Sequence, residues 1–115
     1  MELRELGVVD DARYVRLFVE DKRSLEHWGS DRIARALNER GIERGLIADA
    51  LSLTGAESEL ERAVTLLRRR FPHPPRDRRS RDRALGVLMR KGYDSELALD
   101  ALTAYARDAE HPNVR

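Results

Sequence analysis

Apolar residues along the chain recur with helical spacing, and the pattern repeats after 51 residues. Its first copy contains Arg40, Gly41 and Ile42 followed by Leu46, Ile47, Ala50 and Leu51, and its second contains Lys91, Gly92 and Tyr93 followed by Leu97, Ala98, Ala101 and Leu102. The same offset pairs Leu37 with Leu88, Ala36 with Val87, Val15 with Leu66, and Ala12 with Ala63. A repeat of this length indicates one supersecondary unit stacked on another.

The first copy predicts three helices. A helix over about 12–26, capped by Asp10 or Asp11, has an apolar stripe at Tyr14, Leu17, Phe18 and Leu25. Ser30 is expected to cap a second helix that ends at Gly41, and a third spans about 43–53 and buries Leu46, Ile47, Ala50 and Leu51. Before them, Leu3–Leu6 is expected to end a helix closed by Gly7.

The second copy also predicts three helices, and no segment has the period-two alternation of a strand. Ser58 and Glu61 form a capping box for the first helix, which Pro72, Pro74 and Pro75 end. Ser80 is expected to cap the second helix and Asp94 the third, which reaches about Tyr105. The core residues expected here are Leu60, Ala63, Val64, Leu66, Leu67, Leu85, Val87, Leu88, Met89, Leu97, Leu99 and Leu102.

These patterns predict an all-α fold of tandem three-helix repeats stacked into an elongated crescent. The expected organisation is a helical remnant at 1–8, three-helix repeats at 9–55 and 56–107, and a frayed tail at 108–115. Gly41 and Gly92 mark the register and serve as helix C-caps.

The composition of the chain indicates its cellular compartment and excludes several kinds of active site. The chain lacks cysteine and any apolar run of about 20 residues, so a soluble cytoplasmic protein is expected. His27, His73 and His111 stand apart, and no nucleotide-binding or metalloprotease motif is present. We therefore expect no enzymatic activity, cofactor or metal. Trp28, Tyr14 and Phe18 are expected to pack in the core, with base stacking as the alternative.

The net charge of +1 conceals a strong asymmetry. Residues 68–83 hold eight arginines and two aspartates, a charge of +6, which leaves −5 for the other 99 residues. Such a field attracts nucleic acid or an acidic protein surface, whereas the structural alternative is a solvated loop with flanking helix faces.

Three segments resemble one known family. Leu6-Gly7-Val8-Val9-Asp10-Asp11-Ala12-Arg13-Tyr14, Leu37-Asn38-Glu39-Arg40-Gly41-Ile42 and Leu88-Met89-Arg90-Lys91-Gly92-Tyr93 are similar to motifs of the RecX family, regulators of the RecA recombinase. The likeness covers about residues 3–102 in the family's order and spacing. Two departures are Ala36, where the family usually has an acidic residue, and Phe18, near its customary tryptophan. Members usually carry three repeats, of which the first is mostly missing here.

The resemblance implies a regulator that binds the RecA–DNA filament and restrains its extension and activity. The expected partners are the RecA filament and single- or double-stranded DNA without sequence specificity, and the expected state is a monomer without a membrane partner. The candidate binding residues are all basic: Arg68, Arg69, Arg70, Arg76, Arg78, Arg79, Arg81, Arg83, Arg32, Arg35, Arg40, Arg90 and Lys91. The alternatives are a helix-turn-helix DNA-binding module and a generic helical interaction domain.

Overall fold

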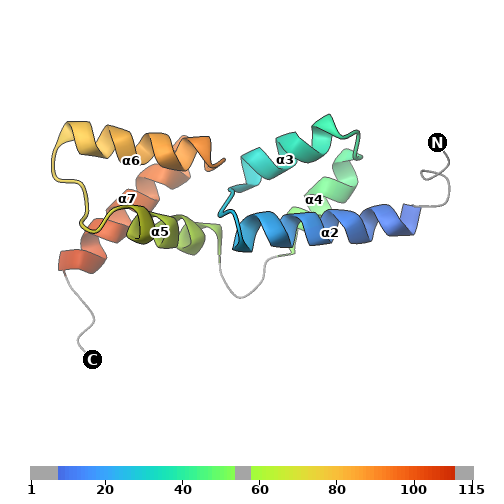
Figure 1. Ribbon diagram of the computed structural model, residues 1–115, viewed down its shortest axis with the longest axis horizontal. Coiled ribbons are helices and arrows are strands. Elements are labelled where there is room, and N and C mark those ends of the chain that lie inside the picture. Colours follow the sequence, from blue (N-terminus) through green and yellow to red (C-terminus); the bar gives the residue numbers. More distant parts are fainter. Residues whose placement is uncertain (1–7, 54–57, 111–115) are drawn as a thin grey trace, which may run out of the picture.

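The structure is a computed structural model that describes residues 8–53 and 58–110, and over these residues the chain is helical without any strand. Six helices occur in the described ranges: α2 Val8–Ser24, α3 Ser30–Glu39, α4 Arg44–Ser52, α5 Glu59–Arg70, α6 Arg78–Arg90 and α7 Ser95–Glu110 (Figure 1). The predicted all-α class is confirmed. The helix end expected at Leu3–Leu6 with Gly7 lies outside the described residues.

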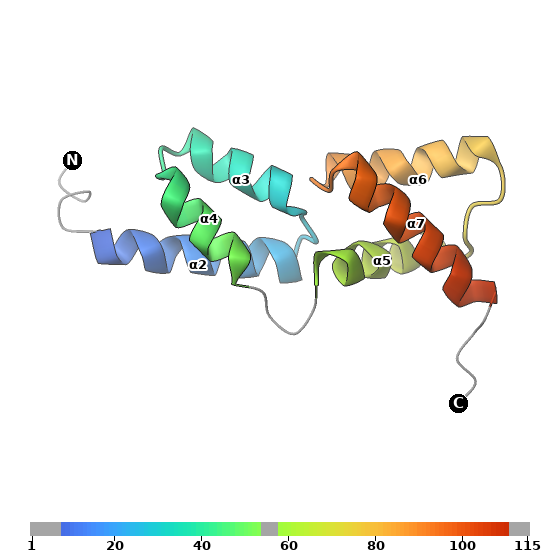
Figure 2. The same cartoon turned by 180° about the vertical axis from the view of Figure 1, so that it is seen from behind.

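The helices form two three-helix units that lie side by side in an elongated molecule of 54 × 32 × 19 Å. Helices α3 and α6 lie nearly end to end along one edge, and α2 and α5 lie along the opposite edge (Figure 1). Helices α4 and α7 cross these pairs at an incline on the other side of the molecule, where Figure 2 shows them in front. The tandem arrangement expected from the 51-residue offset is therefore present.

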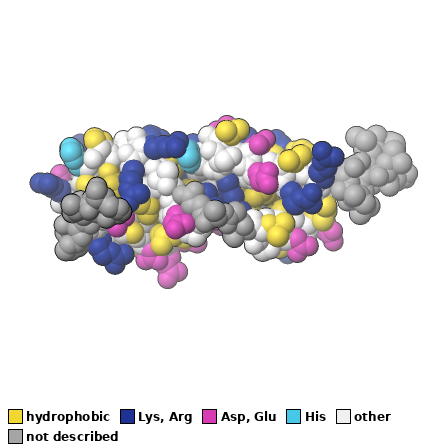
Figure 3. Space-filling model, turned by 90° about the horizontal axis from the view of Figure 1, so that it is seen from below, with side chains coloured by type: hydrophobic (Ala, Val, Ile, Leu, Met, Phe, Trp, Pro, Cys, Tyr) yellow, Lys and Arg dark blue, Asp and Glu magenta, His cyan; other side chains and the backbone are white. Residues whose placement is uncertain are grey.

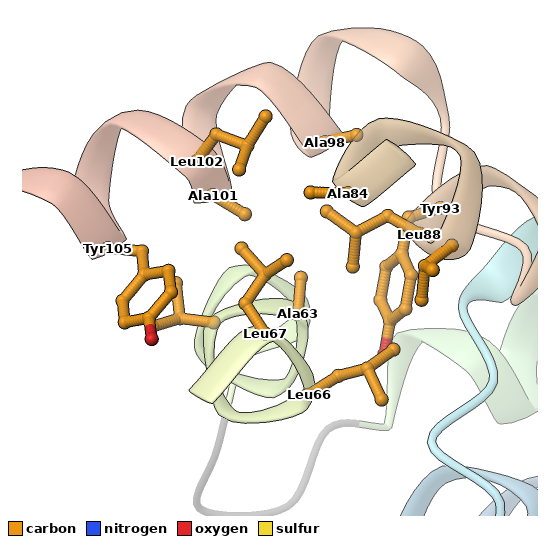
Figure 4. Close-up of a cluster of buried hydrophobic side chains, with 12 residues drawn as sticks. Ala63, Leu66, Leu67, Ala84, Leu88, Tyr93, Ala98, Ala101, Leu102 and Tyr105 are labelled. Carbon is orange, nitrogen blue, oxygen red and sulfur yellow. The ribbon is translucent and has the colours of Figure 1, made fainter. Parts of the chain in front are cut away.

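The core of the second unit is built around the contact between α5 and α7 (Figure 4). Leu67 of α5 is fully buried beside Ala63 and points toward Ala101 of α7, while Ala98 lies near Ala84 of α6. Small residues at this crossing let the two helices approach closely, and the larger side chains fill the space around them. The buried cluster consists of Ala63, Val64, Leu66, Leu67, Ala84, Val87, Leu88, Tyr93, Ala98, Ala101, Leu102 and Tyr105.

The first unit has its own core, in which Phe18 is buried as the predicted stripe on α2 requires, whereas the other three positions of that stripe were wrong. The buried positions are Val15, Phe18, Val19, Ile33, Leu37, Ile47 and Ala50. Tyr14, Leu17 and Leu25 are 43%, 49% and 73% exposed, although they were expected inside. Both sets have helical spacing, so periodicity alone cannot separate them. Packing against α3 and α4 selects the face that carries Val15 and Val19.

The repeat offset correctly identifies the central leucines. Leu37 and Leu88 are both fully buried at equivalent places in α3 and α6. The match weakens in the last helix of each unit, because α4 ends at Ser52 whereas α7 continues to Glu110. Leu102 is buried, but its partner Leu51 is only half-buried against the first core.

Three further leucine or methionine positions were placed in the core incorrectly. Leu60, Met89 and Leu99 are 36%, 51% and 44% exposed. Each neighbours a true core position on its helix, and a small domain leaves much apolar surface in contact with water. Leu46, Leu85 and Leu97 are half-buried at the margins.

Helix ends follow the predicted capping rules at some sites. Ser58 and Glu61 form the complete capping box, and the Asp94 carboxylate accepts from the Leu97 N–H at 2.8 Å. Gly41 and Gly92 follow α3 and α6 with φ of 82° and 105°, which glycine adopts without a steric penalty. The prolines end the preceding helix as expected, since α5 stops at Arg70.

At other sites the predicted cap was wrong. α2 begins at Val8, so Asp10 and Asp11 lie inside its first turn. Asp77, three residues earlier than predicted, caps α6 by accepting from the Ser80 N–H at 2.8 Å. Ser30 is the first residue of α3, whose N-cap is Gly29, and the Ser30 side chain bonds to Glu59 in the second unit instead. α7 also includes residues 108–110, which the pattern assigned to the frayed tail.

The two units join through backbone hydrogen bonds between α6 and α3. The Gly29 N–H donates to the Lys91 carbonyl at 2.7 Å, and the Asp31 N–H donates to the Gly92 carbonyl at 3.0 Å. The first N–H groups of a helix have no acceptor within the helix, and its last carbonyls have no donor. The end of α6 and the start of α3 therefore satisfy each other's hydrogen bonds. The two helix dipoles are also aligned head to tail, which is favourable.

Candidate nucleic-acid and partner interface

The arginine-rich stretch lies at the end of the molecule away from the junction, where α5 ends and α6 begins (Figure 1). The loop between the two helices is anchored at both sides. The Tyr105 hydroxyl of α7 donates to the Phe71 carbonyl, and Asp77 caps α6. All eight arginine side chains of the stretch are exposed: Arg68, Arg69, Arg70, Arg76, Arg78, Arg79, Arg81 and Arg83.

Two of these arginines have partners within the chain. Arg68 forms a 2.6 Å ion pair with Asp108 of α7. Arg69 Nη1 lies 3.0 Å from His27 Nε2 in the first unit, where the guanidinium donates and the ring nitrogen accepts. Both contacts hold the end of α5 in place and reduce what these two side chains can offer to a partner.

The other arginines of the stretch are more available. Five of them make no hydrogen bond or ion pair within residues 8–53 and 58–110: Arg70, Arg76, Arg78, Arg79 and Arg81. The Asp77 carboxylate is occupied by the Ser80 hydroxyl and N–H, which lower the pKa of Asp77 below its ordinary value. The carboxylate keeps its negative charge, and residues 77–81, with three arginines against this one aspartate, still carry a net charge of +2.

The remaining candidate basic residues lie away from the arginine-rich stretch, at the junction of the units and along α3. Arg32, Arg90 and Lys91 lie at the junction of the units, where Arg32 Nη1 donates to the Arg90 carbonyl at 3.1 Å and Lys91 Nζ donates to the Glu26 carbonyl at 2.9 Å. These two bonds support the junction in addition to presenting charge. Arg35 and Arg40 lie further along α3 and are exposed.

The structure thus divides the candidate residues between two surfaces instead of joining them in one patch. The 51-residue offset relates Arg32 to Arg83 and Arg40 to Lys91, so similar charges recur in each unit. Figure 3 shows that on the face seen from below, basic, acidic and apolar side chains are interspersed. Charge on this face is mixed, in contrast to the first turn of α6.

A group that sequence patterns did not assign is a row of alternating cations and rings in the first unit. Arg40 Cζ lies 4.7 Å from the centre of the Phe18 ring, and Lys22 Nζ lies 5.4 Å from it. Lys22 Nζ and Arg32 Cζ lie 4.7 and 4.1 Å from the centre of the Trp28 ring. We call these five residues the cation–aromatic ladder. The spacing of Phe18 and Lys22, one helical turn apart, was its only sequence signal.

A buried charge cluster beside the junction was also missed. Arg23 and Arg62 are 8% and 6% exposed, and their guanidinium groups lie 3.9 and 3.7 Å from Glu59. Arg23 donates to the carbonyls of Leu51 and Leu53, at 3.0 and 3.3 Å, so it also terminates α4. Burial is the main reason that the pKa of Arg23 is lowered, followed by the charge of Arg62.

The described part of the chain contains no cluster of three or more histidine, cysteine or carboxylate residues that fits a metal ion. Nor does any helix within residues 8–53 and 58–110 have the length and apolarity needed to cross a membrane.

Fold and surface together define a class: a helical-repeat protein made of tandem three-helix units with one exposed arginine-rich end. Comparison with known sequences narrows the class to one family. The second three-helix domain of RecX matches residues 10–51, and the third matches residues 57–102. The chain belongs to the RecX family.

Curated relatives support this membership. The chain is 35% identical to the regulatory protein RecX of Leptothrix cholodnii over 98% of its own length and 70% of the relative's. It is 33% identical to that of Streptomyces coelicolor and 30% identical to that of Mycobacterium sp. strain JLS, spanning 60% and 58% of those proteins. No solved structure matches the chain significantly.

Proposed function

We propose that this protein regulates the RecA recombinase by binding the RecA–DNA filament and restraining its extension and activity. The observation that carries the proposal is the match of both units, in order, to consecutive domains of the RecX family. Its relatives are named regulatory proteins, and a role without catalysis of its own accords with that name. The proposed protein is a cytoplasmic monomer whose target is an existing nucleoprotein assembly.

Binding is assigned first to the arginine-rich end of the second unit. Five of its arginines make no pair within the described chain, and three of them, Arg78, Arg79 and Arg81, lie in the first turn of α6, whose helix dipole adds to the positive potential. Guanidinium groups suit both carboxylates and phosphates, because their planar donors pair with two oxygens at once. This surface therefore fits an acidic face of RecA, DNA phosphates, or the filament groove where both occur.

Contacts to phosphates carry no sequence information, so binding without sequence preference is expected. A helix-turn-helix module would instead require a specific operator and a dimer. In this chain the glycine turn at Gly41 joins α3 to α4, so α4 would be the recognition helix of such a module. Arg44 is the one basic residue of α4, which favours the filament-binding proposal over the operator-binding alternative.

The test is a pull-down with RecA filaments assembled on single-stranded DNA, with RecA alone and DNA alone as controls. The charge-reversal variant Arg78→Glu, Arg79→Glu, Arg81→Glu should bind filaments more weakly and inhibit the RecA ATPase less, with a nearly unchanged thermal midpoint. The matched control reverses three other exposed arginines, Arg13, Arg16 and Arg44. Equal affinity of the two variants would move the interface to the Arg32, Arg35 and Arg40 helix. Absence of filament binding by the unaltered protein would refute the function.

A further inference from the structure

We propose that the cation–aromatic ladder of the first unit is a binding surface for the phosphodiester backbone of single-stranded DNA. Phe18 and Trp28 act in it as positioning residues that hold Lys22, Arg32 and Arg40 in a row. This interface is separate from the arginine-rich end but shares Arg32 and Arg40 with the alternative interface named above, so it deepens the proposed function and rests on it for its biological role. Its assay requires no RecA, and the failure of the ladder can therefore be distinguished from the failure of the proposed function.

The three cations are uncompensated. Lys22, Arg32 and Arg40 form no ion pair with a carboxylate within the described ranges 8–53 and 58–110. Their charged groups lie instead over ring faces, at 4.1–5.4 Å from the ring centres. A cation on an aromatic face keeps its charge and its outward-facing donors, so it still attracts an anion.

The rings also fix the positions of the cations before any ligand arrives. Trp28 and Phe18 meet edge to face with ring centres 6.3 Å apart, which makes a rigid support between α2 and α3. Arg40 is held further by a hydrogen bond from Nη1 to the Tyr14 hydroxyl, and Arg32 by its bond to the Arg90 carbonyl. Long basic side chains normally lose rotamer freedom when they bind an anion, and here part of that loss has already occurred.

Exposed apolar groups beside the ladder favour a single strand over a duplex. The ring centre of Tyr14 lies 6.0 Å from that of Phe18, yet Tyr14 is 43% exposed, and Leu17 on the next turn of α2 is 49% exposed. Unpaired bases stack on exposed aromatic rings while basic groups track the backbone, and neither an intact duplex nor an acidic protein surface offers such bases. The ring of Trp28 is covered by two cations, so its role is support.

The assay uses the whole chain and an oligothymidylate of about 20 nucleotides, long enough to span the surface. Trp28 is the sole tryptophan of the chain, so its fluorescence reports directly on the ladder. We expect a saturable change in emission on titration that weakens with salt, because phosphate contacts release counterions. A duplex of equal length should bind more weakly.

Paired variants separate the ladder from general charge. Lys22→Gln with Arg40→Gln should weaken binding several-fold and reduce the slope of log affinity against log salt by about 1.4, or about 0.7 per lost contact. The matched control, Arg13→Gln with Arg16→Gln, removes the same charge from exposed positions roughly on the opposite side of α2 and should leave the slope nearly unchanged. Trp28→Leu retains every charge and should also weaken binding, measured by anisotropy of a labelled strand.

Two results would overturn the proposal. One is equal affinity and salt slope in the ladder and control variants, and the other is tighter binding to the duplex than to the single strand. If the ladder variants bind the oligonucleotide normally but lose RecA filaments, the ladder contacts protein and the proposal is refuted while the proposed function stands. If oligonucleotide binding behaves as expected but no RecA effect exists, the proposed function alone fails.

Discussion

Gly29 of the first unit and Gly92 of the second are in backbone contact, with no space for a side chain on either. A Cβ built on Gly29 would lie 2.4 Å from the Gly92 carbonyl oxygen, and one built on Gly92 would lie 2.3 Å from Cβ of Arg32. This proximity allows the carbonyls at the end of α6 to reach the N–H groups at the start of α3.

Replacing Gly92 by alanine should therefore disrupt the junction, because the obstacles include the backbone of α3. Gly41→Ala is the matched control: Gly41 also has a positive φ, but nothing lies within 4 Å of its added Cβ. We expect Gly41→Ala to cost about 1–2 kcal/mol of unfolding free energy through backbone strain alone. Gly92→Ala should cost about 1–3 kcal/mol more, measured by chemical denaturation. Equal losses would mean that the contact does not constrain the junction.

The central leucines should make similar contributions to their two cores. Leu37→Ala and Leu88→Ala each remove a fully buried side chain, so each should lower the unfolding free energy by about 2–5 kcal/mol. Leu25→Ala, at a 73% exposed position, should change it by less than about 0.5 kcal/mol. Urea titrations monitored by circular dichroism distinguish these outcomes, and a loss under about 0.5 kcal/mol at either buried site would contradict the repeat register.

Glu59 holds two buried arginines and the start of α3. Its carboxylate accepts from the Ser30 N–H at 3.0 Å and lies within 4 Å of both Arg23 and Arg62. Glu59→Gln removes the negative charge, leaves the arginines without it, and should cost about 2–3 kcal/mol of unfolding free energy.

The control for this substitution is Glu61→Gln, two residues along the same helix. Glu61 is exposed and serves the capping box, a role that glutamine also fills, so the change should stay within about 0.5 kcal/mol. If thermal or urea unfolding gives the same unfolding free energy for the two variants, Glu59 does not stabilise the junction.

Asp77 should make the unfolding free energy depend on pH in the acid range. Hydrogen bonds from the Ser80 side chain and N–H lower the pKa of Asp77 in the folded protein below the ordinary 3.8. A lowered pKa means that the ionised group stabilises the fold above pH 3.8, and that this stabilisation is lost as the pH falls through the folded-state value. Asp77→Asn keeps a good N-cap but cannot titrate, so the difference in stability between wild type and variant should shrink from pH 6 to pH 3. A constant difference would contradict the assignment.

The number, order and type of the described helices, and the equivalence of the two units, follow from local features of the sequence. These depend on local physics: apolar spacing, proline stops such as Pro72, and glycines such as Gly41 whose positive φ ends a helix. The capping box at Ser58 and Glu61 was equally legible, because its two hydrogen bonds lie within one turn. Family motifs then linked the units to RecX.

Tertiary packing selects which of two possible stripes α2 buries and which groups satisfy the start of α3. Ser30 illustrates the reason, because its local sequence suits an N-cap. In the structure, carbonyls at the end of α6 accept from N–H groups at the start of α3, and the Ser30 hydroxyl donates to Glu59 instead. Both partners are distant in sequence, so no local rule predicts them. Three other features likewise arise only when the helices pack. They are the distance between Arg32 and Arg78, the contact of Lys22 with the Trp28 ring, and the close backbone contact at Gly92 that leaves no space for a side chain. Each depends on residues from different parts of the chain that the fold brings together or keeps apart.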